Sequence, residues 1–305
     1  MLKMFHPVTA SQRLQRDVML TAALRPDGSL FPIAAEYPIV LGTTGSQYSF
    51  CIGDPDAPSA HANLWPRDLI SQTHHTVLRV GLIGNVASSA EQRGKGNVRA
   101  LMNELKAVAL SQGMEALILW SDLIEFYQKF GFQSCGRELR WHFNRGQLLR
   151  NIKSTLHFQS VSAPSLNDLE RLLNARPPVP YTLKRSPEEF AQLLKIPQLS
   201  LLASTDKKPA YVIVGKGCDM SCVVHEWGAP DPETLIAGVL AAATAHDLED
   251  ILLLTPASLS KNWMDGLKSA AITVSEHPMA LGWRPESATT PDLLTASFIW
   301  GLDSI

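Results

Sequence analysis

The sequence predicts an α/β protein of two tandem units, each a twisted mixed sheet flanked by helices. Three observations lead to this fold class. The 305 residues are enough for two domains of ordinary size. Short runs rich in Val, Leu and Ile, typical of buried strands, alternate with segments whose apolar residues recur every three or four positions, typical of helices. The same order of elements occurs twice, so we expect one unit in residues 1–150 and a second in residues 151–305.

The first half opens with polar, proline-containing segments and two short candidate strands, at 46–52 and 61–65. A more strongly marked strand follows at 76–87, because this segment is rich in the β-branched and aliphatic residues that favour buried strands. A polar loop with two glycines, 88–96, separates it from the next element.

A helix is predicted from Asn97, since the apolar residues that follow recur every three or four positions and form one apolar face. Gly113 ends this helix, because glycine adopts the left-handed conformation of a C-cap without strain. Beyond it we expect a second buried strand at 116–120, a short helix at 122–130 and a further strand that starts at Phe132.

The pattern of elements resets between 144 and 154, and we place the junction of the two units there. Ser186-Pro187-Glu188-Glu189 is typical of a helix start, with Ser186 as the cap, proline in the first turn and Glu189 completing a capping box. The later elements repeat the order of the first half. They are strands at 210–214 and 222–227 joined by a turn at 215–217, a helix at 232–246, a strand at 251–254, a helix at 258–270 and a strand at 272–274.

The charge balance gives no sign of a nucleic-acid partner. Lys and Arg number 27 against 29 Asp and Glu, so we expect no broad basic field. The first residues lack the apolar core and cleavage site of a secretory signal. The longest smooth apolar run, 235–245, is shorter than the ~20 residues that cross a bilayer as a helix. We therefore expect a cytoplasmic protein without a membrane partner, whose oligomeric state the sequence leaves open.

Four scattered cysteines are more consistent with reduced thiols than with a disulfide scaffold in a chain of this length. Cys218 and Cys222 have a spacing that occurs in zinc sites, but no second pair of ligands follows at a matching interval. We expect no metal and interpret both residues as ordinary strand and turn thiols.

The loop that leads into the helix at Asn97 carries the clearest chemical signal. A helix start exposes unpaired N–H groups and the positive end of the helix dipole. Glycines let a phosphate approach these groups closely, and Arg93 and Lys95 add positive charge. The residue types predict an anion site, with a diphosphate as the natural occupant. By itself, such a turn is equally compatible with an ordinary solvated loop.

Arg93-Gly94-Lys95-Gly96, together with the helix that follows, resembles the acetyl-CoA loop of the GCN5-related N-acetyltransferase (GNAT) superfamily. That loop runs Gln/Arg-x-x-Gly-x-Gly/Ala; Arg93 and Gly96 match, and Val98 replaces the usual last glycine or alanine. Further along the chain, residues 126–132 resemble the family's Phe-Tyr-x-x-x-Gly-Phe segment, without the asparagine that often precedes it. The resemblance implies two tandem GNAT-like units, of which the first holds the acetyl-CoA site.

The resemblance implies an N-acetyltransferase that moves an acetyl group from acetyl-CoA, its co-substrate, to an amine by direct attack in a ternary complex. Tyr127 matches the family's proton donor to the departing thiolate, and a phenol with a pKa near ~10 is protonated at neutral pH. The alternative is that Tyr127 is only a packing aromatic. The residues expected to contact coenzyme A are Val86, Ala87, Ser88, Gln92, Arg93, Gly94, Lys95, Gly96, Asn97 and Val98.

The general base and the acceptor stay open. By residue type the candidate bases are Glu36, His61, His74, His75 and Glu91, and ordered water can take the proton instead. A resemblance to the enhanced-intracellular-survival group of acetyltransferases adds the terminal carboxylate at Ile305. Small amines, antibiotics, peptide N-termini and protein lysines are all compatible acceptors.

In the second half the corresponding loop falls at 227–232. Pro230 and Pro232 lack N–H donors and Asp231 would repel a phosphate, so we expect this unit not to bind coenzyme A. Alternation along the preceding strand separates Glu226 from its two neighbours, in either a half-buried strand or a substrate wall. The competing hypothesis for the whole chain is a degenerate acyltransferase that senses acyl-CoA or scaffolds a partner.

Overall fold

The computed structural model describes residues 4–71, 76–152, 156–206, 208–288 and 293–305. The chain folds into two compact units that each combine strands and helices. Unit 1 comprises Met1–Gly136, Met279–Thr295 and Asp303–Ile305, and unit 2 comprises Arg137–Pro278 and Ala296–Leu302. The predicted α/β fold class is confirmed. In the described residues no helix is long and apolar enough to cross a membrane.

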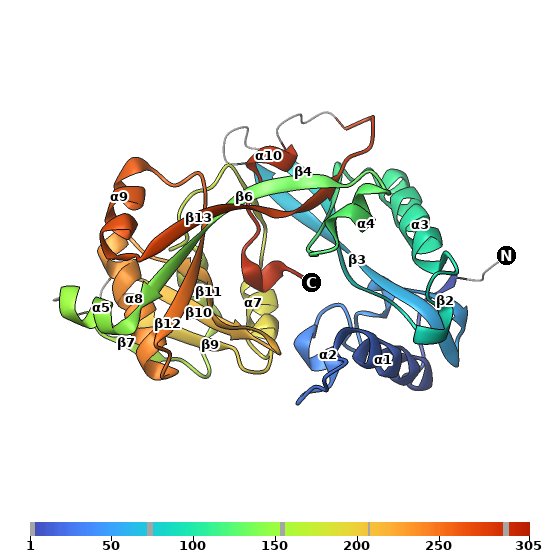
Figure 1. Ribbon diagram of the computed structural model, residues 1–305, viewed down its shortest axis with the longest axis horizontal. Coiled ribbons are helices and arrows are strands. Elements are labelled where there is room, and N and C mark those ends of the chain that lie inside the picture. Colours follow the sequence, from blue (N-terminus) through green and yellow to red (C-terminus); the bar gives the residue numbers. More distant parts are fainter. Residues whose placement is uncertain (1–3, 72–75, 153–155, 207, 289–292) are drawn as a thin grey trace. The chain divides into compact units, whose positions relative to one another are not determined.

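The sheet of unit 1 is built from strands of both chain ends. They are β1 (Met4–Phe5), β2 (Ser49–Asp54), β3 (Ala57–Ser71), β4 (Val77–Ser88), β5 (Ala116–Leu119) and the last residues of β13 (Thr273–Trp283), adjacent in this order (Figure 1). Neighbours from β1 to β4 are antiparallel, whereas β4 and β5 are parallel. Parallel neighbours need a crossover connection, which a helix supplies here.

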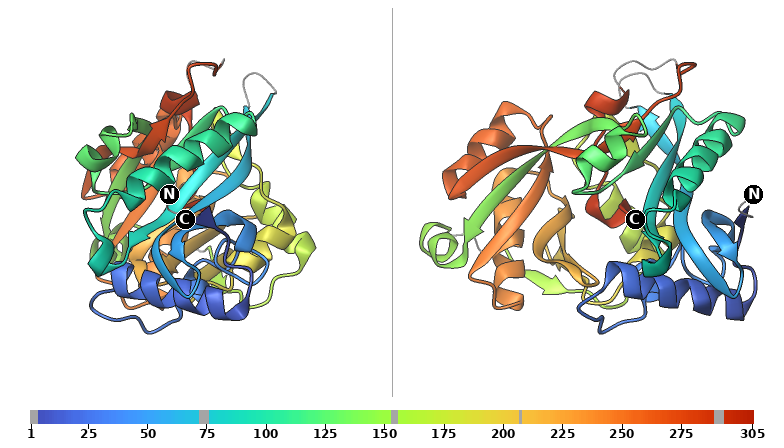
Figure 2. Two further views of the ribbon diagram at one scale, coloured as in Figure 1. Left: turned by 90° about the vertical axis from the view of Figure 1, so that its right-hand side faces the viewer. Right: turned by 45° about the vertical axis from the view of Figure 1, so that its right-hand side comes forward.

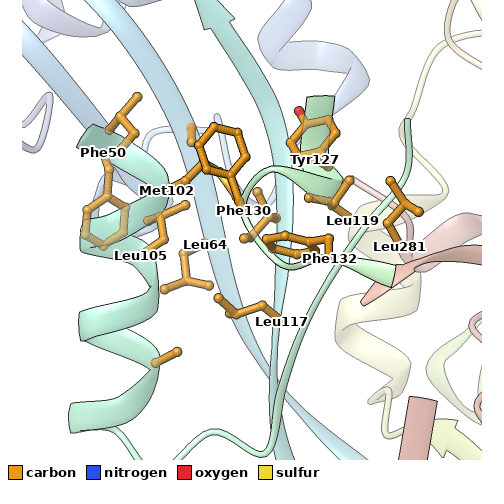
Figure 3. Close-up of a cluster of buried hydrophobic side chains, with 14 of the residues drawn as sticks. Phe50, Leu64, Met102, Leu105, Leu117, Leu119, Tyr127, Phe130, Phe132 and Leu281 are labelled. Atoms are coloured by element: carbon orange, nitrogen blue, oxygen red, sulfur yellow. The ribbon is translucent and has the colours of Figure 1, made fainter. Parts of the chain in front are cut away.

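Helices cover both faces of this sheet. They are α1 (Ala10–Leu24), α2 (Ile33–Glu36), α3 (Asn97–Ser111), α4 (Ile124–Gln128) and α10 (Leu293–Ala296), with the short 3₁₀ turns η1 (Ser46–Tyr48) and η2 (Ala90–Gln92). α1 and α3 lie on opposite faces of β3 and β4 (Figures 1 and 2). The apolar face of α3, with Leu101 and Leu105 fully buried, packs against Leu64 and Leu117 of the sheet (Figure 3). This cluster is the core beneath the candidate site.

In unit 2 the strands follow the order β6-β12-β11-β10-β9-β7 and include parallel and antiparallel neighbours. These strands are β6 (Gln133–Asn144), β7 (Phe158–Ser160), β9 (Ser200–Ser204), β10 (Tyr211–Lys216), β11 (Asp219–Gly228) and β12 (Asp250–Pro256). The short strand β8 (Tyr181–Leu183) lies outside this order. The helices of unit 2 are α5 (Arg145–Asn151), α6 (Leu166–Leu173), α7 (Pro187–Leu193), α8 (Pro232–Ala245) and α9 (Lys261–Ala270). The 3₁₀ turn η3 (Gly301–Asp303) lies near the chain end.

The units divide elsewhere than at the predicted boundary near residue 150. The series strand, helix, parallel strand, helix, strand occurs in both halves, as β4-α3-β5-α4-β6 and β11-α8-β12-α9-β13. In each half the last strand runs on into the other unit. Glu138 to Asn144 of β6 pair with β12, and Leu281 to Trp283 of β13 pair with β5. Each sheet is therefore completed by a strand from the other half of the sequence.

Most of the strongly patterned elements lie where the sequence predicts them, including β4, α3 and β5. Ser186 caps α7, with its hydroxyl accepting a hydrogen bond from the N–H of Glu189. The prediction for the first residues of the chain is incomplete, because α1 lies in a segment that is interpreted from sequence only as polar and for which no helix is predicted. β3 and β13 are also longer than predicted, and β10 extends through part of the predicted 215–217 turn.

Candidate functional site

The carboxyl end of β4 separates from its neighbour β5. Among the described residues, pairing between the two strands ends at Ile83 and Leu119, whereas β4 continues to Ser88. The five residues from Gly84 to Ser88 therefore have no partner strand on that side. Val86 and Ser88 are partly exposed there and Ala87 is 7% exposed. Unpaired main-chain N–H and C=O groups along such an edge can bind an extended ligand.

The loop after β4 forms an open helix start. Gly94 and Gly96 have φ angles of +76° and +83°, in the left-handed region where glycine is favoured, and a Cβ atom at either would meet nothing within 4 Å. Gly96 is the N-cap of α3 and supplies no side-chain cap. In this part of the chain, all of which is described, the N–H groups of Asn97 and Val98 donate no hydrogen bond. Arg93 and Lys95 are exposed beside them. The geometry suits an anion, as the sequence predicts.

The first two residues of α3 point inward. Val98, which departs from the family's pattern, is partly buried and packs against the core cluster. Its side chain therefore contributes to the core rather than covering the loop. Asn97 is 3% exposed, and its amide Nδ2 has no hydrogen-bond partner among the described residues. This buried donor at a helix start is a further group that a bound anion or polar ligand would satisfy.

Tyr127 belongs to the same core cluster as Val86 and Val98. Its ring packs edge-on against Phe126 and Phe132, with centroid distances of 5.1 and 6.1 Å. Figure 3 shows Tyr127 and Phe132 in the same apolar cluster. The side chain is 6% exposed, and its burial raises the pKa of the phenol to about 12, although a hydrogen bond with Ser121 acts in the opposite direction. The phenol therefore holds its proton at neutral pH. The structure thus brings the predicted acid, the strand end and the helix start around one core.

The candidate bases have different surroundings. Glu36 is buried in an ion pair with Arg25, at 2.8 Å, and Glu91 is exposed. His61 is fully buried, and its Nδ1 lies 2.9 Å from the carbonyl oxygen of Asn85 in β4. Burial lowers the pKa of His61 to about 3, so the ring is neutral. His74 and His75 lie outside the described residues.

The segment Asp303–Ile305 lies against the separated end of β4. A Cβ atom at Gly84 would lie 2.3 Å from the main-chain carbonyl carbon of Ile305, so only glycine leaves room for this contact. The segment is held by a buried ion pair, with 3.6 Å between Arg67 Nη2 and Asp303 Oδ1. Ile305 thus lies, like His61, beside the strand predicted to bind the substrate.

A cavity of about 460 Å³ borders the loop on the side of α1. It is lined by one face of α1, by the turn between β2 and β3, and by residues 88–93. Part of the lining consists of small side chains such as Ala22 and Ala57, which do not fill the cavity. Asp56, Glu91 and Arg93 are charged residues of the lining. The loop therefore faces this partly open cavity on one side, and Gly94 and Gly96 are exposed to solvent.

Unit 2 is different at the corresponding position. Asp231 caps α8, with its carboxylate accepting a hydrogen bond from the N–H of Thr234 at 2.8 Å, so a side chain already occupies this helix start. β11 also runs beyond its described pairing with β12, but the indole of Trp227 donates a hydrogen bond to the carbonyl of Leu254 across that interval. The prediction of a half-buried strand is wrong, since His225, Glu226 and Trp227 are all fully buried.

Sequence reasoning missed the polar support beneath the β4 end. Asn85 has a φ angle of +49°, and its side-chain amide donates to Asn63 Oδ1 at 3.0 Å. From sequence, Asn63 is interpreted only as part of a short strand and His61 also as a candidate base, and nothing local shows that they face Asn85. In the described residues no group of three or more His, Cys, Asp or Glu side chains could hold a metal, and neither Cys218 nor Cys222 forms a disulfide there.

Residues 59–135 match the family model of the acetyltransferase (GNAT) domain. Similar solved structures include GCN5-related N-acetyltransferases from Kribbella flavida (TM-score 0.64, 15% identity, 92% of this chain and 70% of that one) and Anabaena variabilis (0.65, 14%, 92% and 72%). Eis1 from Mycobacterium abscessus is a third (0.60, 14%, 92% and 73%). A comparison with curated protein sequences gives no match. The resemblance to the GNAT superfamily is confirmed by the family model, and the structural likeness shows the shared fold.

Proposed function

We propose that this chain, whose residues 59–135 form an acetyltransferase domain of the GNAT superfamily, transfers an acetyl group from acetyl-CoA to an amine. A GNAT domain supports acyl transfer from acyl-CoA to amines in general. The observation that carries the proposal is that an uncapped helix start at Gly96 occurs together with a strand end, Gly84 to Ser88, that pairs with β3 but not with β5. The first suits a diphosphate and the second suits an extended arm, and coenzyme A contains both.

In this proposal the loop holds the diphosphate. The N–H groups at the start of α3 and the side chains of Arg93 and Lys95 would bind its oxygens, with Gln92 at the edge and Gly94 and Gly96 leaving room. The main chain of Val86, Ala87 and Ser88 would pair with the amides of the pantetheine arm. The orphan Nδ2 of Asn97 fits the same polar occupant.

The chemical step is a direct attack in a ternary complex. The amine nitrogen forms a bond to the thioester carbonyl carbon, the carbon–sulfur bond breaks, and the electron pair of that bond leaves on sulfur. Tyr127 donates its proton to this thiolate and is protonated again from solvent. The amine's own proton goes to ordered water or to a candidate base other than His61, which is fully buried. Ile305, whose main chain lies against Gly84 of β4, is one such candidate.

We assign the reaction to unit 1 alone. In unit 2 Asp231 occupies the helix start and would repel a phosphate, and Trp227 bridges the strands where a ligand arm would lie. Unit 2 is thus proposed to be a GNAT-like unit that does not bind coenzyme A. The acceptor is a small-molecule or peptide amine, and the cytoplasmic location and the lack of a nucleic-acid or membrane partner remain predictions.

Thiol release from acetyl-CoA, measured with the full chain over a panel of amines, tests the proposal. Spermidine, kanamycin, a peptide with a free N-terminus and a lysine-rich peptide cover the acceptor classes left open. We expect at least one amine to accelerate thiol release with the stoichiometric appearance of its acetyl amide. Binding of acetyl-CoA without turnover on any amine would instead support the acyl-CoA sensor or scaffold.

A further inference from the structure

A β-bulge shapes β4 at the point where it leaves β5. His61 pairs with Ala87 and Asn63 with Gly84, so Asn85 and Val86 both lie opposite the single residue between them on β3. Asn85 is the bulge residue in the left-handed conformation, with a φ angle of +49°. Asparagine tolerates this region better than most residues, and the bond from its side chain to Asn63 holds it there.

The imidazole of His61 fixes the peptide that follows. Its Nδ1 lies 2.9 Å from the carbonyl oxygen of Asn85, and since a carbonyl can only accept, Nδ1 carries the hydrogen. The ring is fully buried and neutral, so this bond does not depend on pH in the working range. His61 Nε2 then keeps its lone pair and has no partner among the described residues.

A trans peptide turns its N–H away from its C=O. The described chain contains no cis peptide bond, so while His61 holds the carbonyl of Asn85, the N–H of Val86 points to the other side of that peptide plane. Val86 lies in the part of β4 that has no β5 partner. One buried side chain therefore sets the direction of one main-chain donor at the candidate site.

We propose that His61 is a positioning residue, which holds the Asn85–Val86 peptide so that the N–H of Val86 binds the thioester carbonyl oxygen. This inference rests on the proposed acetyl transfer. The N–H would stabilise the negative charge that this oxygen gains as the amine attacks, and a donor fixed beforehand is more effective than one that must reorient. His61 itself touches neither substrate.

Two substitutions at His61 test this role. His61→Leu removes the donor to Asn85, whereas His61→Asn places an amide N–H close to the position of Nδ1. We expect kcat to fall about a hundredfold in His61→Leu, the usual effect of losing one such donor, and to recover to within about tenfold in His61→Asn. The pH profile of kcat should keep its shape in both variants, because a positioning residue does not transfer the proton.

Binding gives a readout that needs no turnover. Calorimetry should show that the wild-type chain binds acetyl-CoA more tightly than coenzyme A, and that His61→Leu loses this preference while its dissociation constant for coenzyme A stays within about threefold. Should His61→Leu fail to fold, His61→Asn must keep the preference. The inference would be overturned if the wild type bound acetyl-CoA no more tightly than coenzyme A. It would also be overturned if His61→Leu kept the preference for acetyl-CoA. Absence of any coenzyme A binding by the wild type would contradict the proposed function instead.

Discussion

Replacing Glu226 by glutamine is expected to lower the free energy of unfolding by about 3 to 5 kcal/mol, the usual cost of removing one partner from a buried ion pair. Glu226 has no exposed side-chain surface. Its carboxylate accepts hydrogen bonds from Arg185 at 2.7 and 3.0 Å, and also from Arg176 and Tyr211. A neutral amide would leave two guanidinium groups without their counter-charge inside unit 2. Urea denaturation followed by circular dichroism measures the change.

The same cluster predicts a pH dependence. Burial raises the pKa of Glu226, but the guanidinium groups of Arg176 and Arg185 outweigh this effect and hold the pKa at about 2, below the ordinary value of 4.5. The carboxylate's contribution to stability is therefore complete above about pH 4.5 and is lost as the pH falls toward 2. Glu170→Gln, at an exposed position on α6, is the matched control and should change stability by less than about 0.5 kcal/mol. Equal losses in the two variants would contradict the role of the cluster.

Replacing Tyr127 by phenylalanine is expected to lower kcat for acetyl transfer about a hundredfold or more, the range of a lost general acid. Without the phenol, the thiolate must take its proton from water. The fold should be unaffected, because phenylalanine fills the same place between Phe126 and Phe132. Steady-state thiol release gives kcat, and calorimetry with coenzyme A shows whether binding is retained.

Tyr48→Phe is the control for this change. Tyr48 is a partly exposed tyrosine of unit 1 whose hydroxyl has no hydrogen bond in the described structure, so its loss should leave kcat within about twofold of wild type. If Tyr127→Phe also turns over at the wild-type rate with coenzyme A binding intact, Tyr127 is only a packing aromatic.

Local patterns were sufficient for the elements around the cofactor loop. The strands β4 and β5 are segments rich in aliphatic residues, and the apolar residues of α3 recur every three or four positions, so each sequence pattern predicts its element. Gly94 and Gly96 adopt the positive φ angles that favour glycine. α1 had a local signal that was missed, since Thr9 and Gln12 form a capping box at its start. β13 is harder to predict, because it contains Pro278 and its first residues are exposed and mostly polar.

The remaining features depend on contacts between distant residues. The strands β6 and β13 each contribute residues to both units. This arrangement depends on which strands pair, and neither residue composition nor hydrophobic periodicity predicts strand pairing. The site residues that sequence reasoning missed have the same origin. Asn63 and Asn85 are 22 residues apart, and only the register of β3 on β4 brings their side chains together. The resemblance to a family located the loop and Tyr127, but the support beneath them required the fold.

The central claim is that the chain has one coenzyme A site, at the start of α3. Isothermal titration of coenzyme A into the full chain and into Gly96→Val tests it most directly. Valine is strained at the φ angle of +83° and places a branched side chain where the phosphates would lie. We expect one site per chain in the wild type and a loss of affinity of at least about tenfold in Gly96→Val. Two sites per chain, or equal affinity in the two proteins, would contradict the account.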